Sequence, residues 1–257
     1  MGSQTQHTIP GPVVLVGSGE YLDVMNEIDG YLLKTLGGAS TARVVLLPTA
    51  SGLELNGPTS WNNLGLQHFS KLGVQDIRAT RIVDRESAYD PEQLALLRDG
   101  TFYYFSGGNP QHIIDSLRDT PAWEIINSAY EQGAILAGCS AGAMMLSGRT
   151  ISIRQVMMGG QLKLVESMGI VPELIVFPHF DRMAGFMDQT RFQQILKEIP
   201  DGYTVVGIDE DTALVRISAN AVDRKLSRWQ VMGRQSVTVF SRDAEAVKLQ
   251  AGAEINL

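Results

Sequence analysis

The chain alternates short apolar runs with stretches of helical spacing, and this alternation limits the folds that it can adopt. The first five apolar runs begin at Val13, Arg43, Val74, Thr101 and Ala134. Each run ends in glycine, proline or polar residues, and a stretch of helical spacing follows. Short strands that are almost wholly apolar and alternate with helices are typical of a parallel sheet covered on both faces. The sequence therefore predicts an α/β fold with a mostly parallel central sheet between two layers of helices.

The sequence changes character in its second half. Residues 149–169 show little periodicity and predict loops and short elements. Strand-like runs then return, with one stretch of helical spacing at residues 183–198. The runs are residues 173–177, 204–208, 212–217 and 236–240. Because the last of them are joined by short turns, the sequence predicts extra antiparallel strands near the C-terminus.

Length and charge narrow the possible functions. The 257 residues are enough for one core, so we expect a single domain at residues 13–257 behind a disordered polar tail, residues 1–12. The 21 basic and 28 acidic side chains give a net charge of -7, which argues against a nucleic-acid partner. The sequence has no apolar stretch of membrane-spanning length, and the tail lacks the apolar core of a secretory signal. The single cysteine cannot form an internal disulfide. From these features together we expect a soluble, cytoplasmic protein.

Residues 138–142 read Gly-Cys-Ser-Ala-Gly and indicate a nucleophile elbow. Such a strand-to-helix turn exposes a serine hydroxyl at the edge of the sheet, beside a helix N-terminus that favours negative charge. Glycines flank the serine because a Cβ there would collide with the strand or the helix. Ser140 holds the central position. Cys139 is a rival nucleophile, but it falls on the last strand position, where a small buried thiol is common.

A serine nucleophile needs a base, and the chain has four histidines. His7 lies in the polar tail, and His68 falls within a predicted surface helix. His112 begins a predicted helix, where the helix dipole disfavours the imidazolium that forms during catalysis. His179 directly follows a predicted strand, at the edge of the sheet to which the elbow points. We therefore predict His179 as the base.

Two glycine turns follow other predicted strands. Residues 107–109 read Gly-Gly-Asn and either reverse the chain or present a backbone N–H which, with that of Ala141, forms an oxyanion hole. Residues 17–19 read Gly-Ser-Gly, but the third glycine of the dinucleotide fingerprint is absent. We therefore expect no cofactor and no metal, and we note that Glu20 could line the pocket.

With these residues assembled, the chain resembles the serine peptidase family that includes dipeptidase E and cyanophycinase, within the class I glutamine amidotransferase-like fold. The motifs that carry the resemblance are Leu15-Val16-Gly17-Ser18-Gly19-Glu20, Leu47-Pro48-Thr49-Ala50-Ser51, Phe105-Ser106-Gly107-Gly108-Asn109, Gly138-Cys139-Ser140-Ala141-Gly142, Pro178-His179-Phe180 and Gly207-Ile208-Asp209-Glu210-Asp211-Thr212-Ala213. The resemblance implies a flavodoxin-like three-layer sandwich. It also implies Ser140 as nucleophile, His179 as base, and oxyanion N–H groups at Gly108 and Ala141.

The family pattern is interrupted at the third catalytic residue. Active members carry an acid soon after the serine, whereas the window here, residues 154–158, holds no carboxylate. Gln155 could fix the imidazole tautomer through its amide oxygen, but it could not stabilise the imidazolium by charge. Glu166 is a second candidate in this stretch, and the distant Asp209 or Glu210 could substitute. An impaired site is therefore an open alternative.

The resemblance implies hydrolysis of an amide bond beside an acidic residue, either in α-aspartyl dipeptides or in a polymer of β-Asp-Arg units. A carboxylate-bearing substrate favours a guanidinium in the pocket. Arg154 and Arg182 are the nearest candidates in sequence, and Asn109 is a third substrate-binding candidate. The arginine-spaced segment associated with cyanophycinase after the histidine is not reproduced at residues 179–189, which favours a small acidic peptide.

The combined prediction is a serine peptidase that forms an acyl-enzyme at Ser140 and assembles as a homodimer, the commonest closed assembly. Two alternatives stay open. One is a catalytically impaired family member that binds a small metabolite. The other is an esterase-type α/β hydrolase, which usually carries its histidine near the chain end; here no histidine follows His179.

Overall fold

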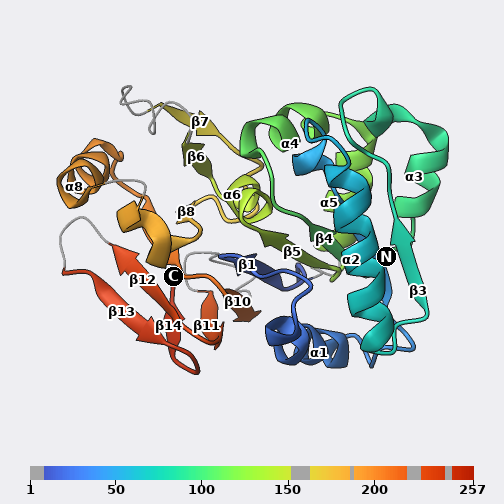
Figure 1. The fold of residues 1–257 in the computed structure, drawn as a ribbon, viewed down its shortest axis with the longest axis horizontal. Coiled ribbons are helices and arrows are strands. Elements are labelled where there is room, and N and C mark those ends of the chain that lie inside the picture. The colour runs from blue at the N-terminus through green and yellow to red at the C-terminus, as the bar shows by residue number, and fades with distance from the viewer. Residues whose placement is uncertain (1–8, 152–162, 186–187, 219–226, 241–244) are drawn as a thin grey trace, which may run out of the picture.

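The computed structural model describes residues 9–151, 163–185, 188–218, 227–240 and 245–257, and its largest element is an eight-stranded sheet (Figure 1). In spatial order its strands are β14 (Glu254–Asn256), β11 (Arg228–Gly233), β10 (Thr212–Ser218), β1 (Val13–Val16), β5 (Ile135–Cys139), β4 (Phe102–Phe105), β2 (Arg43–Leu47) and β3 (Asp76–Ala79). The five strands from β1 to β3 are parallel, and β10, β11 and β14 pair antiparallel. The predicted sheet, with antiparallel strands near the C-terminus, is confirmed.

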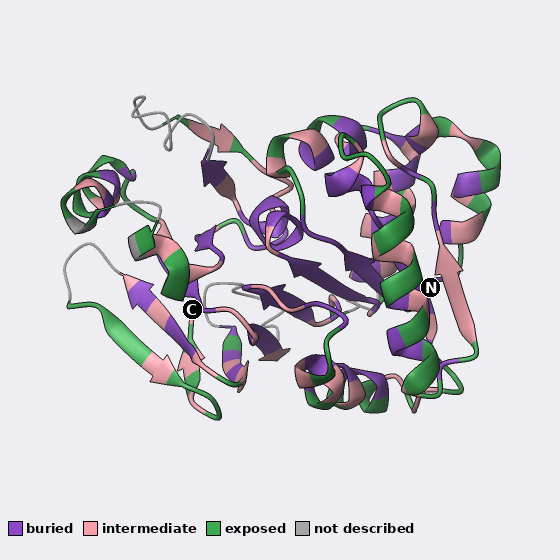
Figure 2. Ribbon diagram, in the orientation of Figure 1, coloured by how far each residue is buried: buried purple, intermediate pink, exposed green. Residues whose placement is uncertain are grey.

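Helices cover both faces of this sheet because its strands are apolar on both sides. Successive side chains of a strand point to opposite faces, so Val14 and Val16 pack on one side and Val13 and Leu15 on the other. On the first side lie α1 (Asn26–Thr35) and α2 (Gly57–Lys71). On the second side lie α3 (Pro91–Leu97), α4 (Pro110–Leu117), α5 (Pro121–Glu131) and α6 (Ala141–Leu146). Figure 2 shows the inner strands buried and the outer surfaces of α2 and α3 exposed.

A second sheet, drawn in orange and red, lies beside the first (Figure 1). Its strands, in spatial order, are β13 (Val247–Gln250), β12 (Ser236–Phe240), β9 (Thr204–Ile208) and β8 (Leu174–Phe177). The helix α8 (Gln189–Glu198) packs Phe192 and Ile195 against Ile175 and Phe177 of this sheet. A hairpin of β6 (Arg149–Ile151) and β7 (Leu164–Glu166) occupies the described part of the segment predicted as loops and short elements.

The packed part of the chain begins before the predicted boundary at residue 13. Gly11 is buried, and its N–H donates a hydrogen bond to the carbonyl of Tyr130 at 2.9 Å. A Cβ at Gly11 would lie 1.9 Å from the carbonyl oxygen of Ala134, so only glycine fits there. Residues 1–8 of the predicted tail lie outside the described residues. Within the described part of the chain, no helix has the length and apolarity needed to cross a membrane.

His68 lies on a helix with an exposed outer face, as predicted, but the solvated or partly packed side chain expected there is wrong. The side chain lies on the inner face of α2 and is 3% exposed. Its Nε2 lies 2.7 Å from Oδ2 of Asp29 on α1, which is 1% exposed. Burial raises the pKa of the Asp29 carboxyl above its usual value, although the contact with His68 opposes the shift. His68 is therefore a core histidine that joins two helices.

Candidate active site

Ser140 stands at the junction of a strand and a helix, at the carboxyl end of the parallel sheet. Strand β5 ends at Cys139, and α6 begins at Ala141. Ser140 has φ 51° and ψ -109°, a conformation that side-chain-bearing residues rarely adopt and that costs about 1–3 kcal/mol. The turn is held at both ends: the N–H of Ser140 donates to the carbonyl of Val16 at 2.9 Å, and its carbonyl accepts from the N–H of Met144 at 3.0 Å. This is the strand-to-helix geometry of a nucleophile elbow.

The flanking glycines of the elbow are required by close approaches of the backbone. A Cβ at Gly138 would lie 2.3 Å from the carbonyl carbon of Gly142. A Cβ at Gly142 would lie 2.5 Å from the carbonyl oxygen of Phe105. Because distances this short are never met in folded proteins, the tight turn at Ser140 depends on both glycines.

His179 brings an imidazole to Ser140 from the second sheet. It follows the end of β8, and its backbone has φ 49°. The Nε2 of His179 lies 3.0 Å from Oγ of Ser140. With the proton on Nδ1, the tautomer assigned from the contacts described next, Nε2 accepts a hydrogen bond from the serine hydroxyl. The two side chains are therefore arranged as a nucleophile and its base.

The other ring nitrogen of His179 contacts a carboxylate. Nδ1 lies 2.9 Å from Oε1 of Glu210, in the turn between β9 and β10. The hydrogen bond from His179, followed by one from Arg182 at 3.1 Å, holds the pKa of the Glu210 carboxyl below its usual value. The backbone N–H of Glu210 donates to Oδ1 of Asp181 at 2.8 Å, and its carbonyl accepts from Nε2 of Gln235 at 3.0 Å. Glu210 is thus fixed as an anionic acceptor behind the imidazole of His179.

Two backbone N–H groups beside the elbow are free to bind an anion. Ala141 is the first residue of α6, and Gly108 lies in the turn after β4 with φ 139°. Within the described residues, neither N–H has a hydrogen-bond partner. A Cβ at Gly108 would lie 2.3 Å from the carbonyl oxygen of Ala50, so this turn also requires glycine.

Comparison with known proteins identifies the family. The model of Peptidase family S51 matches residues 13–222, most of the chain. The chain belongs to peptidase family S51. The matched range includes Ser140, His179 and Glu210. Because the family is a peptidase family, the protein belongs to a family of hydrolases.

Relatives and solved structures agree with this assignment. The chain is 28% identical over 214 residues to a cyanophycinase from Geminocystis herdmanii, covering 80% of this chain and 72% of that protein. It is 27% identical over 209 residues to a cyanophycinase from Trichormus variabilis, of which it spans 64%, less than two thirds. The crystal structure of a peptidase from an acI-B1 Actinobacterium is 33% identical, with a TM-score of 0.83 and coverage of 98% of this chain and 99% of that one. A putative peptidase E protein from Listeria monocytogenes, at 20% identity and a TM-score of 0.55, shares the fold; the alignment covers 95% of this chain and 100% of that one.

Of the residues that the sequence offered behind His179, the structure brings Glu210 to the imidazole and not Glu166. Glu166 lies at the end of β7 and is exposed, and its carbonyl accepts a hydrogen bond from Arg118. Its place behind His179 is taken by Glu210. Gln155 lies outside the described residues. Asp209, the neighbouring alternative, is 4% exposed and accepts a hydrogen bond from the N–H of Ser236 at 3.2 Å, so its carboxylate is already used in the core.

Of the three residues predicted to bind substrate, only Arg182 is seen with its side chain beside Glu210. The side chain of Asn109 accepts hydrogen bonds from the N–H groups of Gln111 and His112 at 2.9 and 3.1 Å, so it caps the start of α4. Arg182 lies at the site, but its Nε is paired with Glu210, and the side chain is 65% exposed. Arg154 lies outside the described residues. The rival base His112 is held by the carbonyl of Val83 at 2.7 Å.

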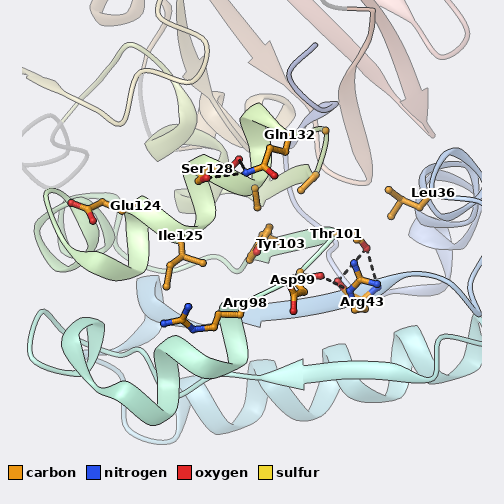
Figure 3. A pocket seen from close by; sticks show the side chains of 14 residues that line it. Leu36, Arg43, Arg98, Asp99, Thr101, Tyr103, Glu124, Ile125, Ser128 and Gln132 are labelled. Carbon is orange, nitrogen blue, oxygen red and sulfur yellow. Dashed lines mark hydrogen bonds between the residues drawn. The ribbon is translucent and has the colours of Figure 1, made fainter. Parts of the chain in front are cut away.

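One hollow of the described surface lies away from Ser140. It measures about 860 Å³ and is lined by Arg43, Arg98, Asp99 and Tyr103 together with part of α5 (Figure 3). Arg43 and Tyr103 belong to the starts of β2 and β4, whereas Ser140 follows the carboxyl end of β5. In parallel sheets ligands bind at the carboxyl ends of the strands, so this hollow is separate from the elbow at Ser140. The described residues contain no cluster of three or more His, Cys, Asp or Glu side chains arranged to hold a metal ion.

Proposed function

We propose that the protein is a serine peptidase in which Ser140, His179 and Glu210 form a catalytic triad. The observation that carries the proposal is the continuous line of contacts from carboxylate to hydroxyl, 2.9 Å from Glu210 to His179 and 3.0 Å from His179 to Ser140. A serine hydroxyl becomes a nucleophile when an adjacent base accepts its proton, and the base acts best when a third group orients it.

The proposed reaction proceeds through an acyl-enzyme. Oγ of Ser140 attacks the carbonyl carbon of the amide bond while Nε2 of His179 takes the hydroxyl proton. The resulting imidazolium is stabilised by Glu210 and returns the proton to the leaving amine. A water molecule then gives its proton to Nε2 of His179 and its hydroxide to the acyl carbon. The imidazolium returns this proton to Oγ of Ser140 as the bond between Oγ and the acyl carbon breaks, and the carboxylic acid product leaves.

The backbone N–H groups of Gly108 and Ala141 are the proposed oxyanion hole. Both are unpaired in the described structure, and Ala141 opens α6, where the helix dipole adds positive potential. Donors that face the oxygen on which charge develops stabilise the transition state more than the substrate. Loss of one such donor costs about 10²- to 10³-fold in turnover.

We propose small peptides that contain aspartate as the substrates. The support is the family, in which the matched relatives are named cyanophycinases, and the exposed guanidinium of Arg182 beside the catalytic carboxylate. A guanidinium group binds a substrate carboxylate through two parallel hydrogen bonds. Action in the cytoplasm as a homodimer remains part of the proposal and rests on composition and on the frequency of twofold assemblies alone.

A fluorophosphonate probe tests the proposed nucleophile. We expect the wild-type protein to be labelled covalently at Ser140 and to release free amino acids from aspartate-containing dipeptides. Ser140→Ala removes the nucleophile and is expected to abolish both reactions, while circular dichroism shows the fold unchanged. A folded wild-type protein that is neither labelled nor active on these dipeptides would refute the proposal. The alternative of an impaired site was motivated by the lack of an acid at residues 154–158. In the proposed triad Glu210 supplies this acid.

A further inference from the structure

The glycine turn after β1 contains a buried carboxylate that the proposed triad does not use. Glu20 ends the Gly17–Glu20 turn and is 6% exposed. A buried carboxylate is tolerated only when donors satisfy its oxygens. The partners of Glu20 therefore indicate why an acid stands at this position behind the elbow.

Both oxygens of Glu20 contact residues adjacent to the proposed catalytic groups. Oε1 accepts a hydrogen bond from the N–H of Gly107 at 3.0 Å. Oε2 accepts one from the thiol of Cys139 at 2.7 Å, the residue that precedes Ser140. Because each partner is a donor, Glu20 serves as an acceptor at both oxygens. Burial, followed by the negative charge of Glu20, raises the pKa of Cys139 well above its usual value, so the thiol keeps its proton and stays a donor.

Gly107 is held between Glu20 and the nucleophile. A Cβ added to Gly107 would lie 3.1 Å from Oε1 of Glu20 and 3.5 Å from Cβ of Ser140. The carbonyl of Gly107 accepts a hydrogen bond from the buried hydroxyl of Ser106 at 3.3 Å. That carbonyl shares a peptide plane with the N–H of Gly108, and in a trans peptide the two point in opposite directions. The orientation of Gly107 therefore sets the direction of the proposed oxyanion donor.

The next peptide is fixed from the other side. The N–H of Asn109 donates to the carbonyl of Ala50 at 2.7 Å. The N–H of Gly107, bound by Glu20, is the corresponding anchor before Gly108. Two consecutive glycines rotate more freely than any other residue pair, so a turn built from them needs an anchor at each end.

We propose that Glu20 is a positioning residue that holds the Gly107-Gly108 turn so that the N–H of Gly108 faces the reacting acyl oxygen beside Ser140. This inference rests on the proposed function, since it assigns a role in the same oxyanion hole. In this role Glu20 acts through the backbone of Gly107 and needs no contact with the substrate.

Two conservative substitutions of Glu20 separate the effect of side-chain length from the effect of its negative charge. Glu20→Gln keeps the length of the side chain and an acceptor oxygen for the N–H of Gly107, but it removes the charge. Glu20→Asp keeps the charge and withdraws the acceptor by one methylene. Cys139→Ala is the matched control, because it removes the other partner of Glu20 and leaves the Gly107 contact intact.

The measurement is the second-order rate constant for fluorophosphonate labelling, because the phosphoryl oxygen of the probe enters the oxyanion hole. We expect Glu20→Asp to slow labelling by about 10- to 100-fold, a part of the loss caused by removing a donor outright. Glu20→Gln and Cys139→Ala are expected to stay within about fivefold of the wild type. The pH profile of the rate is expected to keep its shape in all variants, since His179 and Glu210 are untouched.

The outcomes are distinguishable. A wild-type protein that is not labelled would refute the proposed function itself. If the wild type is labelled, equal rates for folded Glu20→Asp would overturn the positioning role. A slow Glu20→Gln beside a fast Glu20→Asp would also overturn it, because charge rather than the Gly107 contact would then matter.

Discussion

Ser140 combines the proposed chemistry with backbone strain. Its φ of 51° lies where glycine is favoured, and one glycine on each side of it, Gly138 and Gly142, is needed to keep the turn tight. The strain lifts the hydroxyl to the carboxyl edge of the sheet, where Nε2 of His179 is 3.0 Å away. The strained backbone thus lowers stability at the residue on which the proposed activity depends.

This strain predicts that two variants without the hydroxyl differ in stability, although both are inactive. Ser140→Gly is expected to be more stable than Ser140→Ala by about 1 kcal/mol, because glycine adopts the conformation without strain. Both variants lack the hydroxyl and are expected to be inactive. Urea unfolding of the two variants, monitored by circular dichroism, measures the difference. A Ser140→Ala protein as stable as Ser140→Gly would show that the turn is not strained.

At the scale of elements, α1 and α2 are joined by a buried pair of polar side chains. The contact of 2.7 Å between Asp29 and His68 lies within an otherwise apolar layer that includes Tyr21 and Phe69. The ring of Tyr21 packs 5.9 Å from that of His68. Each polar partner satisfies the other, so removing one leaves the second buried without compensation.

Asp29→Ala is expected to lower the free energy of unfolding by about 3–5 kcal/mol, the cost of breaking a buried pair from one side. Asp29→Asn keeps a hydrogen-bonding group at the same place and is the matched control, with an expected loss of about 1–2 kcal/mol. Urea unfolding at pH 7 measures both. A loss in Asp29→Ala no greater than in Asp29→Asn would mean that the pair does not bind the two helices together.

The helices and strands of the first half could be predicted from the sequence because each buries its own apolar pattern. The runs at β1, β2, β4 and β5 end in turns whose glycines and polar residues are visible in the sequence. The burial of His68 was not predicted. Helical spacing shows which residues share a face of a helix, but it does not show that a polar partner, here Asp29, lies on the neighbouring helix. The second sheet was missed because it pairs strands that are far apart in the sequence, such as β8 and β9.

At the scale of the whole molecule, the candidate site is assembled from both sheets. Ser140 follows β5 of the large sheet, and His179 follows β8 of the second. Glu210 lies in the turn by which the chain passes from β9 of the second sheet to β10 of the first. Local patterns were enough to pick out Ser140 and His179, which the structure brings together. For the third residue the sequence left Gln155, Glu166, Asp209 and Glu210 open, because only the three-dimensional path of the chain brings Glu210 to His179.

The proposed triad is tested most directly by comparing Glu210→Gln with Glu166→Gln in the rate of fluorophosphonate labelling at Ser140. Glu210→Gln keeps the shape of the side chain but loses the charge that stabilises the imidazolium, and we expect the rate to fall by about 10²- to 10⁴-fold. Glu166→Gln removes an exposed carboxylate of β7 that does not contact His179, and the rate is expected to match the wild type. An unchanged rate in Glu210→Gln, or a comparable loss in Glu166→Gln, would contradict the assignment of Glu210.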